Sequence, residues 1–338
     1  MASMQDIADK AGVSRVTVSR VLSNHPSVKA ETRKKVLHWV RELEYEPNLI
    51  AQSLAGNGTN LIGLLVPEIA YPFFSEIIEA IENQAFYAGY SVIICNTRRS
   101  LEREKNILKE LKQRRAEGVI AVPVSPERSA AAYQRFQRPT VMITKQVEGF
   151  SCVYISHYAG GQQLAKHFLN VGFQRIGYIG PTKDSTSALK YAGFQNYLAS
   201  HRVRLTDVID CPAPENMNAS EVYQRVKQYA AGPGLRCEAY LTNDDITACE
   251  TIAAFRELGY AVPKDIAIAS FDNSLLAKEI SPKLTALAQP LEEIGRKAVE
   301  ALLEQINDGA LARMYELESR IIVRESTINF VSGQRSDG

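Results

Sequence analysis

The sequence has little of what marks a secreted, membrane-spanning or metal-binding protein. Its five cysteines fall at irregular spacings with no Cys-x-x-Cys pair, which argues against disulfides and against metal ligation. The N-terminus MASMQDIADKAG contains no apolar signal core, and no run approaches the roughly 18 to 20 apolar residues of a membrane span. We therefore expect a cytoplasmic protein with no membrane partner, whose thiols are reduced core residues: Cys95, Cys152, Cys211, Cys237 and Cys249.

Common catalytic motifs are also missing. The sequence has no phosphate loop of the GxxxxGKS type, no GxGxxG after a strand, no GxSxG elbow and no HExxH, and its five histidines are scattered. An enzyme is therefore not indicated, and the sequence calls for no cofactor, no metal and no catalytic residues.

Charge is distributed unevenly along the chain. The whole sequence has 39 basic and 38 acidic residues, so its net charge neither favours nor excludes a nucleic-acid partner. Between residues 10 and 41, a single acid, Glu31, accompanies eight basic residues. This block is either a solvated helical face or a surface for nucleic acid. Its basic residues are Lys10, Arg15, Arg20, Lys29, Arg33, Lys34, Lys35 and Arg41.

The first 46 residues have helical apolar spacing and no strand-like run, which predicts a small three-helix unit. The turn 11–14 (AGVS) offers a glycine for a tight turn and a serine that caps the next helix, as a helix-turn-helix requires. In the helix from Arg15 to Leu22, we expect Val18, Val21 and Leu22 to face the core. The residues left facing outwards suit a DNA major groove: Arg15, Val16, Ser19 and Arg20.

After residue 60, apolar runs of strand length alternate with longer helical stretches. Continuous apolar strands separated by helices are typical of parallel sheets that are covered on both faces. The predicted strands lie near residues 61–66, 91–95, 118–122, 140–143, 175–179, 207–211, 239–241 and 266–271.

A short internal repeat divides this α/β region into two halves. Residues 62–67 (IGLLVP) and 176–181 (IGYIGP) share the form Ile-Gly-apolar-apolar-x-Pro, each before about 110 residues of alternating elements. Chance similarity between two buried strands is the alternative. The repeat favours two similar lobes, with a ligand cleft outside the carboxyl ends of their strands.

The whole chain resembles the LacI/GalR family of bacterial transcription regulators. The stretch MQDIADKAGVSRVTVSRVLSNHPSVKAETRKKVLHWVRELEYEPNLIAQSLA is similar to the family's DNA-binding head and hinge. The stretches PFFSEIIEAIE, GFQRIGYIGP, LTNDDITACETIAAFRELGYAVPKDIAIASFDN and SPKLTALAQPLEEIGRKAVEALL resemble its effector-binding core, which is similar to periplasmic sugar-binding proteins.

The resemblance implies a domain organisation. Residues 1–46 form a helix-turn-helix DNA-binding domain, 47–59 a hinge helix and linker, and 60–338 a bilobed effector-binding and dimerisation core. In this core, subdomain 1 covers about 60–157 and 289–319, and subdomain 2 covers about 158–288 and 320–330. Some family members have a heptad helix that joins dimers into tetramers, whereas the C-terminal NFVSGQRSDG has no apolar heptads, so we expect a homodimer.

The resemblance also implies residues that contact a pseudo-palindromic double-stranded operator. Arg15, Val16 and Arg20 match the base-reading positions, and Ser14, Thr17 and Ser19 lie near phosphates or bases. Thr17 and Ser19 are alternatively ordinary helix-surface residues. The hinge contributes Asn48, Ala55 and the minor-groove leucine, Leu54.

The hinge segment NLIAQSLA, residues 48–55, is too short to be a stable helix alone. Eight helical residues span about 12 Å, and isolated helices below roughly 12 to 15 residues are marginal. We expect the segment to become helical only when two copies pair on DNA. It departs from the family in one respect, because residues 47–60 contain no basic side chain.

The implied effector contacts carry over unevenly. Asp272 matches a carboxylate that binds hydroxyls. Asn243 and Asp244 begin a helix, so capping of that helix is the competing role for them. The aromatic pair Phe73 and Phe74 either stacks on ligand or enters the core. Lys190 replaces the arginine that the family usually has, and Thr144, followed by Lys145, replaces a common aspartate. These departures suggest an anionic effector such as a sugar acid or sugar phosphate. The alternative is that either lysine is surface-exposed.

The sequence therefore predicts a sequence-specific repressor of carbohydrate-metabolism genes, controlled allosterically by a sugar-like effector. A stand-alone sugar-binding transport component is the alternative, since the core resembles one. The absence of a signal segment and the presence of the helix-turn-helix head argue against it.

Overall fold

The chain folds into two compact units, Met1–Thr59 and Asn60–Gly338. The computed structural model describes residues 2–22, 25–45, 58–183, 185–211 and 221–328 of the 338-residue chain. No helix among these residues is long and apolar enough to cross a membrane.

The first unit is the predicted helix-turn-helix. Its helices are α1 (Met4–Ala11), α2 (Arg15–Leu22) and α3 (Ala30–Glu42). Gly12 ends α1 with φ of 62°, a left-handed conformation that glycine adopts without a steric penalty. Ser14 Oγ then accepts a hydrogen bond from Thr17 N at 3.1 Å, which caps α2. The core contains Ile7, Ala8, Ala11, Val18, Val21, Val36 and Tyr45.

The second unit contains two six-stranded sheets, in the orders β11-β5-β4-β3-β1-β2 and β12-β10-β9-β8-β6-β7. The strands of the first sheet are β1 (Leu61–Val66), β2 (Ser91–Asn96), β3 (Gly118–Ala121), β4 (Thr140–Ile143), β5 (Ser151–Ile155) and β11 (Met314–Leu317). Those of the second are β6 (Ile176–Gly180), β7 (Leu205–Asp210), β8 (Ala239–Thr242), β9 (Ala267–Asp272), β10 (Thr285–Ala288) and β12 (Arg320–Ile322).

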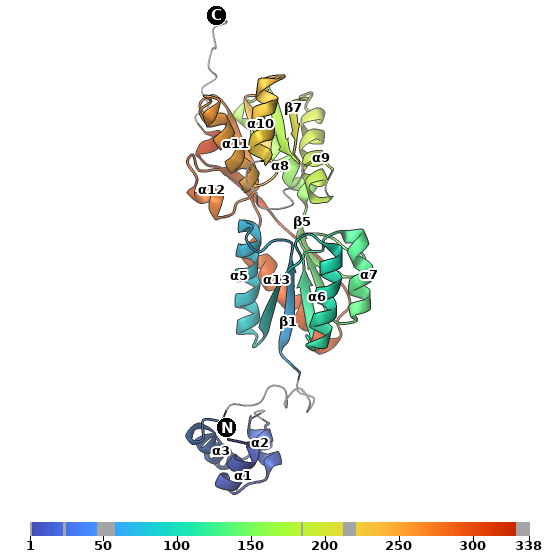
Figure 1. Cartoon of the computed structure of the whole chain (residues 1–338), viewed down its shortest axis with the longest axis vertical. Coiled ribbons are helices and arrows are strands. Elements are labelled where there is room, and N and C mark those ends of the chain that lie inside the picture. Colours follow the sequence, from blue (N-terminus) through green and yellow to red (C-terminus); the bar gives the residue numbers. More distant parts are fainter. Residues whose placement is uncertain (1, 23–24, 46–57, 184, 212–220, 329–338) are drawn as a thin grey trace, which may run out of the picture. The chain divides into compact units, whose positions relative to one another are not determined.

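Helices cover both faces of each sheet, which confirms the predicted α/β architecture of two parallel-sheet lobes (Figure 1). In the first lobe, α5 (Pro72–Tyr87) and α13 (Leu291–Asp308) pack on one face, and α6 (Leu101–Gln113) and α7 (Pro126–Phe136) on the other. In the second lobe, the two pairs are α10 (Glu221–Ala231) with α11 (Asp245–Glu257), and α8 (His157–Val171) with α9 (Ser185–Ser200). Two short helices complete it: α12 (Leu275–Glu279) and the 3₁₀ helix η1 (Glu325–Thr327).

The chain passes between the lobes three times. It leaves the first sheet after β5, returns after β10 to form α13, and crosses again between β11 and β12. Each lobe is therefore assembled from segments that are distant in sequence. One pairing differs from an all-parallel arrangement, because β12 runs antiparallel to β10.

The internal repeat corresponds to β1 and β6, which occupy the same place in their sheets, each beside the edge strand. The glycine shared by the two repeats is required by close packing. A Cβ on Gly63 would lie 2.4 Å from Leu111 Cδ1, and a Cβ on Gly177 would lie 2.4 Å from Tyr240 Cε1. The prediction of two similar lobes is confirmed.

The cysteines are all free, as expected. Cys152, Cys211 and Cys237 are buried, whereas Cys95 and Cys249 are half-buried. Burial raises the pKa of the Cys95 and Cys249 thiols to about 11 and that of Cys211 and Cys237 to about 12. The thiolate is the reactive form, so the raised pKa values keep these side chains in the less reactive thiol form at neutral pH.

Candidate DNA-binding surface and effector pocket

The helix α2 presents the outward face that the sequence predicts. Val18 and Val21 are buried, whereas Arg15, Ser19 and Arg20 are exposed. Val16 is 60% exposed, an unusual position for a branched apolar side chain in a small unit. The exposed valine offers apolar contact to a thymine methyl group. The two arginines beside it offer hydrogen-bond donors to a guanine edge.

The hydroxyl groups near the start of α2 have local partners. Ser14 Oγ and Thr17 Oγ1 lie 2.9 Å apart, and Ser14 also caps the helix. Both residues therefore have a structural role in addition to the predicted contact with DNA. The other predicted DNA contacts, Asn48, Leu54 and Ala55, lie outside the described residues.

Two members of the basic block interact within the unit. The Arg33 guanidinium donates to the His25 carbonyl oxygen at 2.8 Å, and Lys10 Nζ lies 5.7 Å from the centroid of the Trp39 ring. Arg15, Arg20 and Arg41 are exposed. The basic block thus combines side chains that stabilise the unit with side chains that a partner can reach.

The second unit contains a cavity of about 100 Å³ at the carboxyl ends of strands from both lobes. Thr144 follows β4, Asn243 follows β8 and Asp272 ends β9, which is the position expected for a ligand site in parallel sheets. The structure brings all the predicted effector residues to this one cavity: Phe73, Phe74, Thr144, Lys145, Lys190, Asn243 and Asp272.

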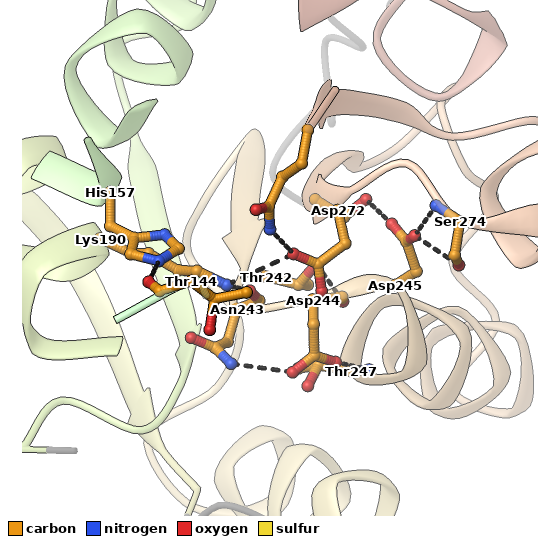
Figure 2. A network of polar contacts seen from close by, with 12 residues as sticks. Thr144, His157, Lys190, Thr242, Asn243, Asp244, Asp245, Thr247, Asp272 and Ser274 are labelled. Atoms are coloured by element: carbon orange, nitrogen blue, oxygen red, sulfur yellow. Dashed lines mark hydrogen bonds and ion pairs between the residues drawn. The ribbon is translucent and has the colours of Figure 1, made fainter. Parts of the chain in front are cut away.

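A polar network fixes Asp272 on the cavity wall (Figure 2). Its Oδ1 accepts a hydrogen bond from Gln289 Nε2 at 2.8 Å and lies 3.7 Å from Lys190 Nζ. Burial raises the pKa of the Asp272 carboxyl group, and the ammonium of Lys190 opposes that rise. Lys190 and Gln289 therefore hold Asp272 as a hydrogen-bond acceptor in the cavity.

Lys190 itself is only 5% exposed, so the interpretation of this lysine as a surface residue is wrong. Its Nζ donates to the Asn243 carbonyl oxygen at 2.9 Å and lies 4.5 Å from the centroid of the Phe271 ring. Lys145 is half-buried, and its Nζ donates to the carbonyl oxygens of Pro123 and Val124 at 3.1 and 3.2 Å. Both ammonium groups thus have partners within the protein.

The capping role at the start of α11 belongs to Asp244. Its Oδ1 accepts from Thr247 N at 2.8 Å, and its Oδ2 accepts from Asn243 Nδ2 at 2.8 Å. Asn243 Oδ1 accepts from the Tyr178 hydroxyl at 3.4 Å. Asn243 is therefore not the cap, and the capping residue instead orients its side-chain amide.

Both rings of the aromatic pair have the core role that the sequence left open, and their stacking on a ligand stays a prediction. Phe73 is buried in the core of the first lobe, whereas Phe74 is half-buried and packs against that core. Their ring centroids lie 5.2 Å apart in an edge-to-face arrangement, and Tyr71 lies 5.7 Å from Phe74. Both phenylalanines line the cavity, so their core role does not remove them from the site.

The cavity includes polar residues that sequence reasoning missed. They come from the ends of β2 and β10 and the starts of α5, α8 and α9. Some of them could have been found from their position in the sequence directly after a strand, because residues that follow parallel strands meet at one edge of the sheet. These residues are Tyr71, Arg99, His157, Thr186, Ser187 and Gln289; the cap of α11, Asp244, also lines the cavity and was considered with Asn243 from the sequence.

His157 is neutral in this site. Its ring is buried, and burial, assisted by the nearby charge of Lys190, lowers its pKa to about 3. Nε2 lies 3.2 Å from the carbonyl oxygen of Thr144. Because a carbonyl only accepts, Nε2 carries the proton and Nδ1 is an acceptor.

Two family models match the chain. The model for bacterial regulatory proteins of the lacI family matches residues 3–48, which include all three helices of the first unit. The model for a periplasmic binding protein-like domain matches residues 165–327.

Full-length relatives match both units. The HTH-type transcriptional repressor PurR of Photobacterium profundum is 31% identical over 334 residues, covering 96% of this chain and 98% of that protein. The ribose operon repressor of Halalkalibacterium halodurans is 30% identical over 331 residues, covering 97% of each chain. Among solved structures, the lac repressor dimer bound to operator and the anti-inducer ONPF matches with a TM-score of 0.86 and 27% identity, covering 96% of this chain and 99% of that chain.

Proposed function

The chain belongs to the lacI family of bacterial regulatory proteins, and from this membership we propose that it is a sequence-specific repressor of carbohydrate-metabolism genes. One observation carries the proposal. A single chain joins a helix-turn-helix with an exposed reading face to a bilobed core with a small polar cavity. A stand-alone transport component is not favoured, because it leaves the helix-turn-helix without a role.

On the DNA side, α2 enters the major groove of a pseudo-palindromic operator and the chain acts as a homodimer. Arg15, Val16 and Arg20 read base edges, and each good bidentate contact contributes roughly 1 to 3 kcal/mol of discrimination. Ser14, Thr17 and Ser19 lie beside them, and Leu54 enters the minor groove with Asn48 and Ala55 nearby. The exposure of the α2 face and the similarity to an operator-bound repressor support this arrangement.

On the effector side, a sugar or sugar-like molecule binds the cavity and alters operator affinity. Support comes from the carboxylate and amide groups that line the cavity and from a relative named as a ribose operon repressor. The cavity of about 100 Å³ has room for a small molecule, since a single water needs only roughly 10 to 15 Å³. The function requires no catalytic reaction, and a regulator of bacterial operators works in the cytoplasm.

The DNA-binding proposal is tested by selecting genomic fragments with the purified full-length protein. Enrichment of fragments that share one inverted repeat is expected. Affinity for such a fragment should fall about 10³-fold or more between 50 and 200 mM salt if 6 to 10 phosphates are contacted. If no sequence is enriched, or if binding does not respond to salt, the proposed function is wrong.

Replacing Arg20 by alanine separates base reading from phosphate contact. Affinity for the selected operator should fall roughly 5- to 150-fold, and affinity for random DNA should change far less, because a base-reading contact acts only at the right sequence. Arg41→Ala, an exposed arginine on α3, is the matched control for the loss of one positive charge. Both affinities are measured by fluorescence anisotropy. If Arg20→Ala lowers the affinity for the operator and for random DNA equally, Arg20 contacts a phosphate and not a base.

A further inference from the structure

Three polar atoms around the effector cavity lack partners in the protein. Among the described residues, only three buried side-chain nitrogen or oxygen atoms have no hydrogen bond: Arg99 Nε, His157 Nδ1 and Gln289 Oε1. All three side chains line the same cavity. An unsatisfied buried polar atom is unfavourable by about 1 to 3 kcal/mol, and native proteins contain few of them. Three at one place indicate groups that a ligand satisfies.

The hydrogen-bonding character of each atom is determined by its neighbours. Gln289 Nε2 donates to the Asp272 carboxylate at 2.8 Å, so the other amide atom, Oε1, is an acceptor. The proton of His157 is on Nε2, which faces the Thr144 carbonyl at 3.2 Å, so Nδ1 is also an acceptor. Arg99 Nε is a donor on a permanently charged group. The ligand must therefore supply two donors and one acceptor, as hydroxyls and an acid group do.

The charges around the cavity show where the acid group binds. The lining residues include three cations, Arg99, Lys145 and Lys190, and two carboxylates, Asp244 and Asp272. Lys190 faces Asp272 and the Asn243 carbonyl oxygen, and Lys145 donates to two backbone carbonyls. Among the described residues, no ion pair forms at Arg99. Of the three cations, Arg99 is therefore the one with a buried side-chain donor left unsatisfied.

From these contacts we propose that the effector is a monosaccharide-sized polyol with one acid group, which Arg99 binds while hydroxyls donate to Gln289 Oε1 and His157 Nδ1. The planar fork of a guanidinium matches two oxygens of a carboxylate or phosphate. The single excess positive charge favours a carboxylate. The inference rests on the proposed function only in calling this ligand an effector, because the binding chemistry stands on the cavity alone.

Calorimetry on the full-length protein tests the proposal with matched probes. The panel compares D-galactose with D-galacturonate, and D-glucose with D-glucuronate, D-gluconate and D-glucose 6-phosphate. Comparing the carboxylate sugars with the phosphate sugar shows which acid group the site prefers. At least one acid should bind 10-fold or more tightly than its neutral parent, since a hydrogen bond to a charged group contributes about 1.5 to 3 kcal/mol.

Variants locate the acid group in the cavity. Arg99→Gln should lower the affinity for the acid about 10- to 100-fold and change the affinity for its neutral parent by no more than about 2-fold. Arg98→Gln removes the same charge from the adjacent exposed residue, which does not line the cavity, and should leave both affinities unchanged. Arg99→Lys keeps the positive charge without the planar guanidinium, and it should retain a reduced preference for the acid. This variant also tests the proposal if Arg99→Gln does not fold.

Several outcomes would overturn the inference. These are a neutral sugar bound as tightly as its acid, an Arg99→Gln or Arg99→Lys variant with the full acid preference, or no acid bound at all. The proposed function fails separately. If the protein selects an operator but prefers neutral sugars, the proposed function holds and the acid-binding inference is wrong. If it binds acids but selects no DNA sequence, the acid-binding site holds and the proposed function is wrong.

Discussion

At the residue scale, Asp245 is a buried carboxyl group behind the effector cavity. It accepts hydrogen bonds from Ser270 Oγ, Ser274 N and Ser274 Oγ at 2.5 to 2.7 Å (Figure 2). Burial, followed by the negative charge of Asp272, raises its pKa to about 7. These bonds hold the turn between β9 and α12, so Asp245 positions the segment that follows Asp272.

The raised pKa of Asp245 predicts a pH-dependent stability. An unfolded aspartate has a pKa near 3.9, so between about pH 4 and 7 the folded state holds a proton that the unfolded state has lost. The free energy of unfolding should therefore contain a contribution that is present at low pH and is lost as the pH rises through about 7. Each unit of the pKa shift corresponds to about 1.4 kcal/mol.

Asp245→Asn removes this titration while keeping a side chain that can bond the two serines. Its free energy of unfolding, relative to the unmodified protein, should increase between pH 5 and pH 8 in urea titrations. Asp308→Asn, at the exposed end of α13, controls for the loss of one negative charge. A difference that stays constant with pH for Asp245→Asn would contradict the assigned pKa.

The residues that the family resemblance indicated as effector contacts lie together in the structure, and their contact with an effector stays a prediction. All seven effector positions that the resemblance indicated, Asp272 and Lys190 among them, line one cavity. Gln289 was missed because it follows β10, a four-residue strand that was not predicted, and Arg99 was missed although the strand before it was predicted, because it lies three residues beyond the end of β2. The lysines were recognised as charges, but their partners, which are backbone carbonyls, cannot be read from a sequence.

At the element scale, the crossing of α8 and α9 positions Lys190. A Cβ on Gly193 would lie 2.0 Å from the backbone oxygen of Tyr158, and a Cβ on Gly161 would lie 2.3 Å from the backbone oxygen of Lys190. The two helices therefore approach closely through two glycines. Lys190 lies one turn before Gly193 on α9, so this contact sets its distance from Asp272.

Gly193→Ala should force α8 and α9 apart, because its new Cβ meets backbone that has no rotamer to change. Overpacking of this kind destabilises by typically 1 to 3 kcal/mol, which lowers the melting temperature by several degrees. Affinity for an acid sugar that binds the unmodified protein should fall as well. Gly232→Ala, where the nearest atom lies 3.5 Å away at the end of α10, is the control. Equal melting temperatures for the two variants would show that the crossing tolerates a methyl group.

Strand prediction succeeded for most buried apolar runs, missed the buried strand β5, and failed for three short strands. All eight predicted strands are present; β1 and β4 have the predicted bounds, and the ends of the others differ by at most two residues. The four that were missed are β5, β10, β11 and β12. β11 and β12 have three or four residues and are half-exposed, and β10 is the four-residue run TALA, so they show little of the pattern that identifies a strand. Their pairing is set by tertiary contacts between distant parts of the chain.

At the scale of the whole molecule, the lobes of the second unit contact each other beside the cavity. Glu76 on α5 of the first lobe accepts a hydrogen bond from Leu275 N at 2.6 Å and lies 3.7 Å from Lys278 Nζ on α12 of the second lobe. Ile246 at the start of α11 packs against the core of the first lobe. A ligand between Arg99 in one lobe and Asp272 in the other therefore binds where the lobes already meet.

In the proposed function, one chain reads DNA with its first unit, and a ligand bound to the second unit changes its affinity for the operator. Coupling of this kind is a free energy shared by two sites, so the ligand and the operator must alter each other's affinity by the same factor. A factor of about 5 to 150 in either direction is typical of such coupling.

The most direct measurement is the affinity of the full-length protein for its selected operator, by fluorescence anisotropy, with and without a saturating acid sugar found by calorimetry. The dissociation constant should change at least about 5-fold. Arg99→Gln should lose this response at the same sugar concentration, and Arg98→Gln should keep it. An operator affinity that is unchanged while calorimetry shows the cavity to be saturated would contradict the account.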